Sequence, residues 1–124
     1  MSPRLPRTAN AGFDQNALWG DPVAQSDIWA AHNPFDLATE LRCIPVFVSV
    51  GNGQAGPFDP PGTGVDPLEQ WLNEETDQMV DHLRAEHVSV TADFYGPGTH
   101  SWPYWQRELH KSLPMLMHSI GVAL

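Results

Sequence analysis

The sequence predicts an α/β fold with parallel strands flanked by helices, and three observations support this prediction. Two short runs, Ile44–Val50 and Val88–Tyr95, are rich in β-branched and aromatic residues, as expected of buried strands. Apolar residues recur at helical spacing after each run, over 68–83 and 103–122. The resulting order of helix, strand, helix, strand and helix is typical of parallel strands joined by right-handed crossovers. Two strands make only a small sheet, so we expect the edge of a larger, incomplete one.

The N-terminal third of the chain is expected to contain loops and short helices. Residues 1–10 are polar and contain prolines, so we expect them to be disordered or loop-like, with the domain itself in 11–124. Asn33-Pro34 interrupts the chain, and a short helix is expected before Arg42. In the segment 13–32, which precedes Asn33-Pro34, five apolar residues are expected to act as anchors: Leu18, Trp19, Val23, Ile28 and Trp29.

The boundaries of the later elements carry clear sequence signals. A glycine- and proline-rich loop, 51–64, follows the first strand and is long enough to indicate a function. Asp66-Pro67 predicts the start of the next helix, because aspartate is a good N-cap and proline is favoured at the first helical position. In the last helix, Pro114 is expected to cause a kink or a split.

The composition excludes several classes of partner. The 124 residues carry a formal net charge of −9, which repels phosphate backbones and anionic lipids, so we expect no nucleic-acid partner. Cys43 is the single cysteine, so no internal disulfide can form. No apolar run has the length of a membrane span, and the first ten residues do not resemble a signal peptide, which leaves the compartment unknown.

An acid and a histidine lie just beyond the predicted strands, where functional groups collect in parallel sheets. His100 follows the second strand, and its imidazole can accept a proton near neutral pH. Glu69, at the start of the helix after the first strand, can supply the carboxylate that orients such a histidine. Nearby acids are equally titratable, and the residues alone do not choose among them: Asp66, Glu74 and Glu75.

No cofactor or metal site is expected from the motifs. The sequence contains no G-x-G-x-x-G motif and no phosphate-binding loop. Five further histidines lack the H-E-x-x-H spacing or any comparable ligand spacing: His32, His82, His87, His110 and His118.

Four sequence motifs carry information about family. The most specific is the block Gly98-Thr-His-Ser-Trp-Pro-Tyr-Trp105, and the supporting motifs are Trp19-Gly-Asp-Pro22, Asn33-Pro34 and Gly51-Asn-Gly53. Together they resemble the C-terminal half of the actinobacterial trehalose mycolyltransferases, which belong to a wider esterase family that includes the S-formylglutathione hydrolases. The resemblance covers roughly residues 11–124.

This resemblance implies an α/β-hydrolase fold with a Ser-Glu-His triad. It implies that His100 is the general base and that Glu69, in the pair Leu68-Glu69, is the catalytic acid. Trp102 is implied to lie beside the acyl or sugar site, so the expected substrates are acyl esters or glycolipids. The mycolyltransferases carry a cysteine before Gly-Asn-Gly where this chain has Val50, which favours a general esterase over mycolyl transfer. Relatives of the mycolyl type are secreted.

The sequence lacks the third member of such a triad. None of its serines lies in a G-x-S-x-G motif: Ser2, Ser26, Ser49, Ser89, Ser101, Ser112 and Ser119. We therefore expect the C-terminal part of a serine esterase or acyltransferase that is inactive without an N-terminal half. The alternative is a non-catalytic binding or assembly module that retains this layer of the hydrolase. Self-association through an exposed sheet edge is a third, weaker expectation.

Overall fold

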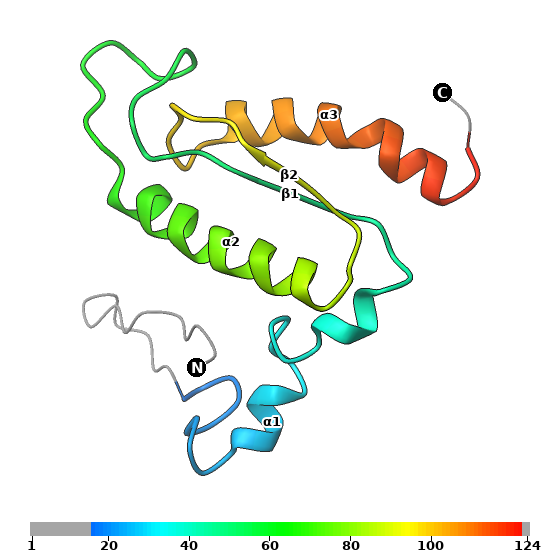
Figure 1. The fold of residues 1–124 in the computed structure, drawn as a ribbon. Coiled ribbons are helices and arrows are strands. Elements are labelled where there is room, and N and C mark those ends of the chain that lie inside the picture. The colour runs from blue at the N-terminus through cyan, green and yellow to red at the C-terminus, as the bar shows by residue number, and fades with distance from the viewer. Residues whose placement is uncertain (1–15, 123–124) are drawn as a thin grey trace.

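A computed structural model describes residues 16–122 of the chain (Figure 1). The expectation for residues 1–10 lies outside these described residues. The elements in chain order are α1 (Ser26–Ala30), the short 3-10 helix η1 (Ala38–Leu41), β1 (Val46–Val50), α2 (Pro67–Ala85), β2 (Val90–Phe94) and α3 (Trp102–Ser119). Both predicted strands and both long predicted helices are present, and the short helix expected before Arg42 is η1.

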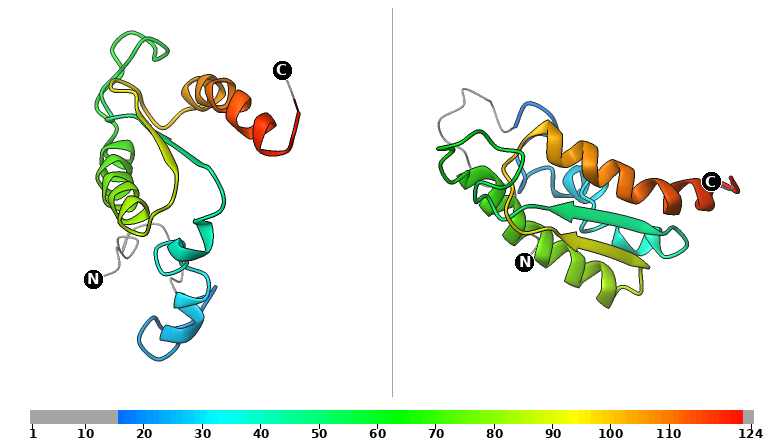
Figure 2. Two further views of the ribbon diagram at one scale, coloured as in Figure 1. Left: turned by 45° about the vertical axis from the view of Figure 1, so that its right-hand side comes forward. Right: turned by 90° about the horizontal axis from the view of Figure 1, so that it is seen from above.

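The two strands form a parallel pair, as the sequence predicts. Val46 lies opposite Val90 and Val50 lies opposite Phe94, with α2 as the crossover between the strands. Figures 1 and 2 show α2 and α3 on opposite faces of this small sheet. The described residues therefore form a mixed α/β arrangement of two parallel strands flanked by helices.

The core lies between the sheet and α2. Leu83 of α2 and Val88 are buried together with Ala38 of η1, and Val46 and Val90 of the strands pack against them. Because side chains alternate along a strand, the next residues in each strand face α3 instead. Asp93 lies on that second face, where its carboxylate accepts a hydrogen bond from Lys111 Nζ of α3 at 2.6 Å.

The start of α2 is fixed by the cap that the sequence predicts. Asp66 Oδ1 accepts hydrogen bonds from the backbone N–H groups of Leu68 at 3.0 Å and Glu69 at 3.3 Å. Pro67 occupies the first helical position, where its missing N–H costs no hydrogen bond. Asp66 also donates its own N–H to the Gly53 carbonyl at 2.7 Å, which ties the helix to the loop after β1.

Pro114 lies inside α3 without dividing it, so of the expected kink or split the split does not occur. Proline removes one intrahelical hydrogen bond and strains the preceding turn. The helix persists because one face of it is buried: Tyr104, Glu108 and Ser112 follow at intervals of one turn and pack against the rest of the molecule.

The segment before β1 is less buried than the sequence predicts. Leu18, Val23 and Ile28 are exposed, so the expectation that they anchor the segment is wrong. For Ile28 the reason is the shortness of α1, a five-residue helix that buries none of its side chains, whereas Leu18 and Val23 lie in turns that precede this helix. Trp19 and Trp29 instead pack edge to face, with their ring centres 5.1 Å apart. Trp29 Nε1 also donates to the Gly20 carbonyl at 3.0 Å.

Candidate active site

Two loops meet at the carboxyl ends of β1 and β2. The backbone N–H of Asn52 donates to the Gly96 carbonyl at 2.9 Å, and that of Gly53 donates to the Gly98 carbonyl at 3.1 Å. A Cβ atom at Gly51 would lie only 2.6 Å from the Gly98 carbonyl oxygen, so only glycine permits this approach. The loop contacts place residues 98–101 directly beside the start of α2.

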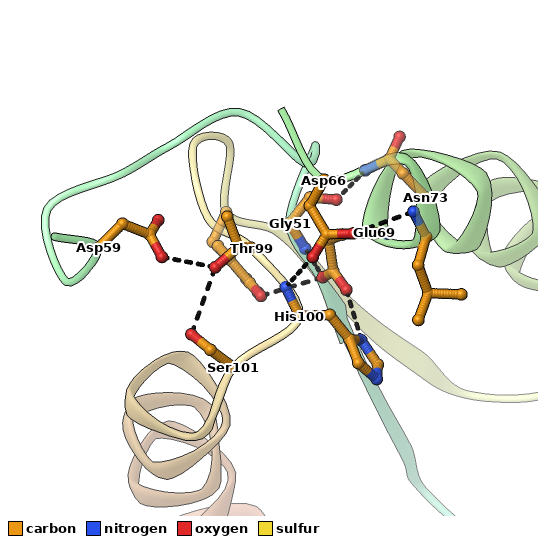
Figure 3. Close-up of polar contacts among 10 residues, drawn as sticks. Gly51, Asp59, Asp66, Glu69, Asn73, Thr99, His100 and Ser101 are labelled. Atoms are coloured by element: carbon orange, nitrogen blue, oxygen red, sulfur yellow. Dashed lines mark hydrogen bonds and ion pairs between the residues drawn. The ribbon is translucent and has the colours of Figure 1, made fainter. Parts of the chain in front are cut away.

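Glu69 and His100 meet at this point, although 31 residues separate them in the chain. Glu69 Oε2 lies 2.8 Å from His100 Nδ1, and Figure 3 shows the two side chains facing each other. A carboxylate only accepts hydrogen bonds, so the Nδ1 proton must lie on the imidazole and point at Glu69. In this tautomer Nε2 carries a free lone pair and can accept a proton.

Glu69 is almost fully buried, with 2% of its surface exposed. Its second oxygen, Oε1, accepts hydrogen bonds from the Gly51 N–H at 2.7 Å and from the Tyr95 hydroxyl at 3.2 Å. With His100, three donors surround the carboxylate, which compensates for its removal from water. The His100 side chain is 37% exposed, so a buried acid holds a histidine that solvent or substrate can reach.

Asp66 holds the main chain of the histidine while Glu69 holds its ring. Asp66 Oδ2 accepts the His100 N–H at 2.8 Å (Figure 3). That hydrogen bond is the main reason why the pKa of Asp66 lies below its ordinary value, and the bonds to the α2 cap contribute further. Of the other acids that the sequence left open, Glu74 is exposed and Glu75 lines a cavity of about 510 Å³ beside α1.

An aromatic pair borders the other side of the histidine. The Trp105 ring packs edge to face on His100 at 4.7 Å, and Trp102 packs on Trp105 at 5.0 Å. Trp102 is 77% exposed and extends from the first position of α3. The structure therefore places Trp102, the third predicted site residue, near the His100 imidazole, in a position that solvent can reach.

A second polar cluster fixes the long loop 51–65 against the start of α3. Asp59 accepts hydrogen bonds from Thr99 Oγ1 at 2.5 Å, from the Tyr104 hydroxyl at 2.7 Å and from the Gly56 N–H at 2.8 Å. Burial raises the pKa of Asp59, but these hydrogen bonds outweigh burial and lower the pKa overall. Thr99 immediately precedes His100, so this cluster holds the loop 98–101 from the side opposite Glu69 (Figure 3).

Sequence reasoning missed two residues of this arrangement, Tyr95 and Asp59. Tyr95 ends the strand predicted for 88–95, and Asp59 lies in the loop predicted for 51–64 without being singled out. Tyr95 is the first residue beyond β2, so it lies at the same carboxyl edge of the sheet as His100. That position is the sequence signal that could have identified Tyr95 as a site residue. Within 16–122 no three histidine, cysteine or acidic side chains form a group that could hold a metal ion. Over the same range no helix is long and apolar enough to cross a membrane.

Comparison with known proteins finds distant sequence similarity to enzymes of one kind. The chain is 29% identical over 115 residues to the diacylglycerol acyltransferase/mycolyltransferase Ag85B of Mycolicibacterium smegmatis, covering 89% of this chain. It is 26% identical over 117 residues to the protein of the same name from Mycobacterium intracellulare, covering 90% of this chain. The chain is a distant, partial relative of these mycolyltransferases.

The relationship to the mycolyltransferases covers a defined part of them. The chain spans about a third of their length, 35% of the first relative and 34% of the second. The similarity is to the C-terminal part of the hydrolase, in agreement with the two parallel strands and flanking helices described above. No family profile matches the chain.

Proposed function

We propose that this chain supplies the acid and the histidine of a Ser-Glu-His triad in a serine esterase or acyltransferase. The observation that carries the proposal is the 2.8 Å hydrogen bond between buried Glu69 and the exposed ring of His100. A buried acid that fixes the tautomer of an accessible histidine is the arrangement that general-base catalysis of acyl transfer requires. The distant similarity to the mycolyltransferases supports the same chemistry.

In this proposal the serine comes from a segment outside the 124 residues, and residues 11–124 form the C-terminal portion of the hydrolase domain. The serine oxygen attacks the carbonyl carbon of an ester while His100 Nε2 takes the hydroxyl proton. Glu69 stabilises the imidazolium that forms. His100 then gives the proton to the departing alkoxide, which leaves an acyl-enzyme and a free alcohol. Water or a sugar hydroxyl, deprotonated by His100, then attacks the acyl-enzyme carbonyl, and protonated His100 returns the proton to the serine oxygen as the acid or ester product leaves.

The substrate class follows from the surroundings of His100. Exposed Trp102 and the adjoining Trp105 offer an apolar, aromatic surface beside the proposed base. Such a surface suits an acyl chain or the face of a sugar ring. We therefore propose acyl esters, glycolipids among them, as substrates, with Trp102 as a binding residue.

A chimera tests the proposal. The C-terminal third of the M. smegmatis relative is replaced by residues 11–124 of this chain, and hydrolysis of a short-chain aryl ester is measured. We expect turnover that falls by roughly 10³-fold or more in H100A and by about 10³–10⁴-fold in E69Q. The matched control is H118A, because His118 is exposed near the far end of α3.

Two results would contradict the proposal. One is a chimera that melts cooperatively but neither hydrolyses the ester nor reacts at its serine with a fluorophosphonate. The other is an active chimera in which H100A behaves like H118A. The first result favours a non-catalytic module that retains the hydrolase layer, because the 124 residues themselves contain no G-x-S-x-G motif.

A further inference from the structure

Tyr95 connects the proposed catalytic acid to Arg107 and Tyr104 of α3. Its hydroxyl donates to Glu69 Oε1 at 3.2 Å, while His100 uses the other oxygen, Oε2, at 2.8 Å. The Arg107 guanidinium carbon lies 4.5 Å from the centre of the Tyr95 ring. Tyr104 stacks on the same ring at 5.7 Å with an angle of 5° between the planes. The ring of Tyr95 is therefore held between other side chains and cannot rotate freely.

The hydroxyl of Tyr95 has the properties of a permanent donor. Burial, and then the charge of Glu69, raise the pKa of Tyr95 far above its ordinary value, so the phenol keeps its proton across the range in which histidine titrates. A cation over the ring withdraws electron density from it, which makes the hydroxyl a better donor. Donation to Oε1 draws negative charge away from Oε2, the oxygen that faces the imidazole.

We propose that Tyr95 is a positioning residue that locks the Glu69 carboxylate in place and sets how strongly it stabilises protonated His100. This inference rests on the proposed function of Glu69 and His100 and adds a regulator of that pair. The consequence is directional. Removing the hydroxyl leaves more negative charge on Oε2, so the imidazolium is stabilised more and His100 titrates at higher pH. A stronger donor at the same position acts in the opposite sense.

The experiment follows the imidazole resonance of His100 by NMR through a pH titration of the full chain. The resonance is assigned by its absence in H100Q. We expect the midpoint to rise by roughly 0.3–1 pH unit in Y95F. Y104F is the matched control, because it removes the other tyrosine hydroxyl of the chain, which bonds to Asp59 rather than Glu69. It should shift the midpoint by less than Y95F does, because this hydroxyl reaches His100 only through the loop and not through the Glu69 carboxylate.

A second variant avoids dependence on the folding of Y95F. The chain contains two tyrosines, so in the Y104F background biosynthetic incorporation of fluorotyrosine labels Tyr95 alone. Fluorination strengthens the phenol as a donor and should lower the midpoint. An unchanged or lower midpoint in Y95F, an equal rise in Y104F, or a rise on fluorination would overturn the role of Tyr95. E69Q separates the two proposals: it should lower the midpoint, and a midpoint that E69Q leaves unchanged would contradict the Glu69–His100 pair itself.

Discussion

At the scale of single residues, Asp66 divides its two oxygens between two tasks. Oδ1 caps α2, whose first turn carries Glu69, and Oδ2 accepts the backbone N–H of His100. One side chain therefore fixes the distance between the element that carries the acid and the loop that carries the histidine. Glu69 and His100 then need only small side-chain adjustments to reach 2.8 Å. This arrangement explains why Asp66, one of the alternative acids, bonds to the backbone of both segments while Glu69 bonds to the imidazole.

Two substitutions separate the tasks of Asp66. D66A removes the cap and the acceptor for His100, and we expect it to lower the free energy of unfolding by about 1–2 kcal/mol. D66N keeps a good N-cap residue but replaces an acceptor oxygen by an NH₂ group, so it should cost less while moving the amide proton shift of His100. Urea unfolding and a two-dimensional NMR spectrum measure both effects. Equal stability losses in the two variants would show that the cap contributes little.

At the scale of elements, the sequence predicts those helix and strand positions that depend on neighbouring residues. Asp66-Pro67 identified the first residue of α2, and the apolar runs identified both strands, because caps and periodicity are encoded by neighbouring residues. The family resemblance selected Glu69 from four acids, which the residues alone did not. The roles of Tyr95 and Asp59 were not predicted, because their partners lie 26 and 40 or more residues away in the chain. The continuity of α3 through Pro114 likewise depends on tertiary packing.

The loop 51–65 depends on the charge of Asp59, and its stability should therefore depend on pH. Hydrogen bonds lower the pKa of Asp59 in the folded state below its ordinary value of 3.8. A lowered pKa means that this carboxylate stabilises the fold above the ordinary value and loses its contribution as the pH falls through the folded one. We expect D59N to melt at a lower temperature than the wild type at neutral pH, with the difference shrinking below about pH 4.

A thermal melt series followed by circular dichroism measures this difference. The matched control is D77N, because Asp77 is exposed on α2 and should show no such trend. A difference in melting temperature between D59N and wild type that stays constant from neutral to acid pH would contradict this prediction. It would mean that Thr99 and Tyr104 bond to protonated Asp59 as well as to its carboxylate.

At the scale of the whole molecule, apolar side chains remain uncovered along α3. Leu109 and Leu116 are spaced by seven residues, which places them on one face of the helix, and both are exposed. These two leucines form an apolar stripe on α3, and exposed apolar surface along one helix face is typical of an interface. The described sheet has two strands, whereas the mycolyltransferases are about three times as long as this chain. The stripe is therefore expected to pack against protein outside residues 16–122.

Dye binding tests whether this stripe is accessible in the isolated 124-residue chain. We expect a fluorescent apolar dye to bind at neutral pH, and L109Q/L116Q to reduce the signal by at least half while changing the free energy of unfolding by less than about 0.5 kcal/mol, because both leucines are exposed. L18Q/V23Q is the matched control, since Leu18 and Val23 are exposed but lie outside α3. No dye binding together with a cooperative melt would show that the chain covers this face by itself. A signal lost equally in both double variants would place the dye elsewhere, and a sedimentation run that shows dimers dissociating only in L109Q/L116Q would identify a second copy as the cover.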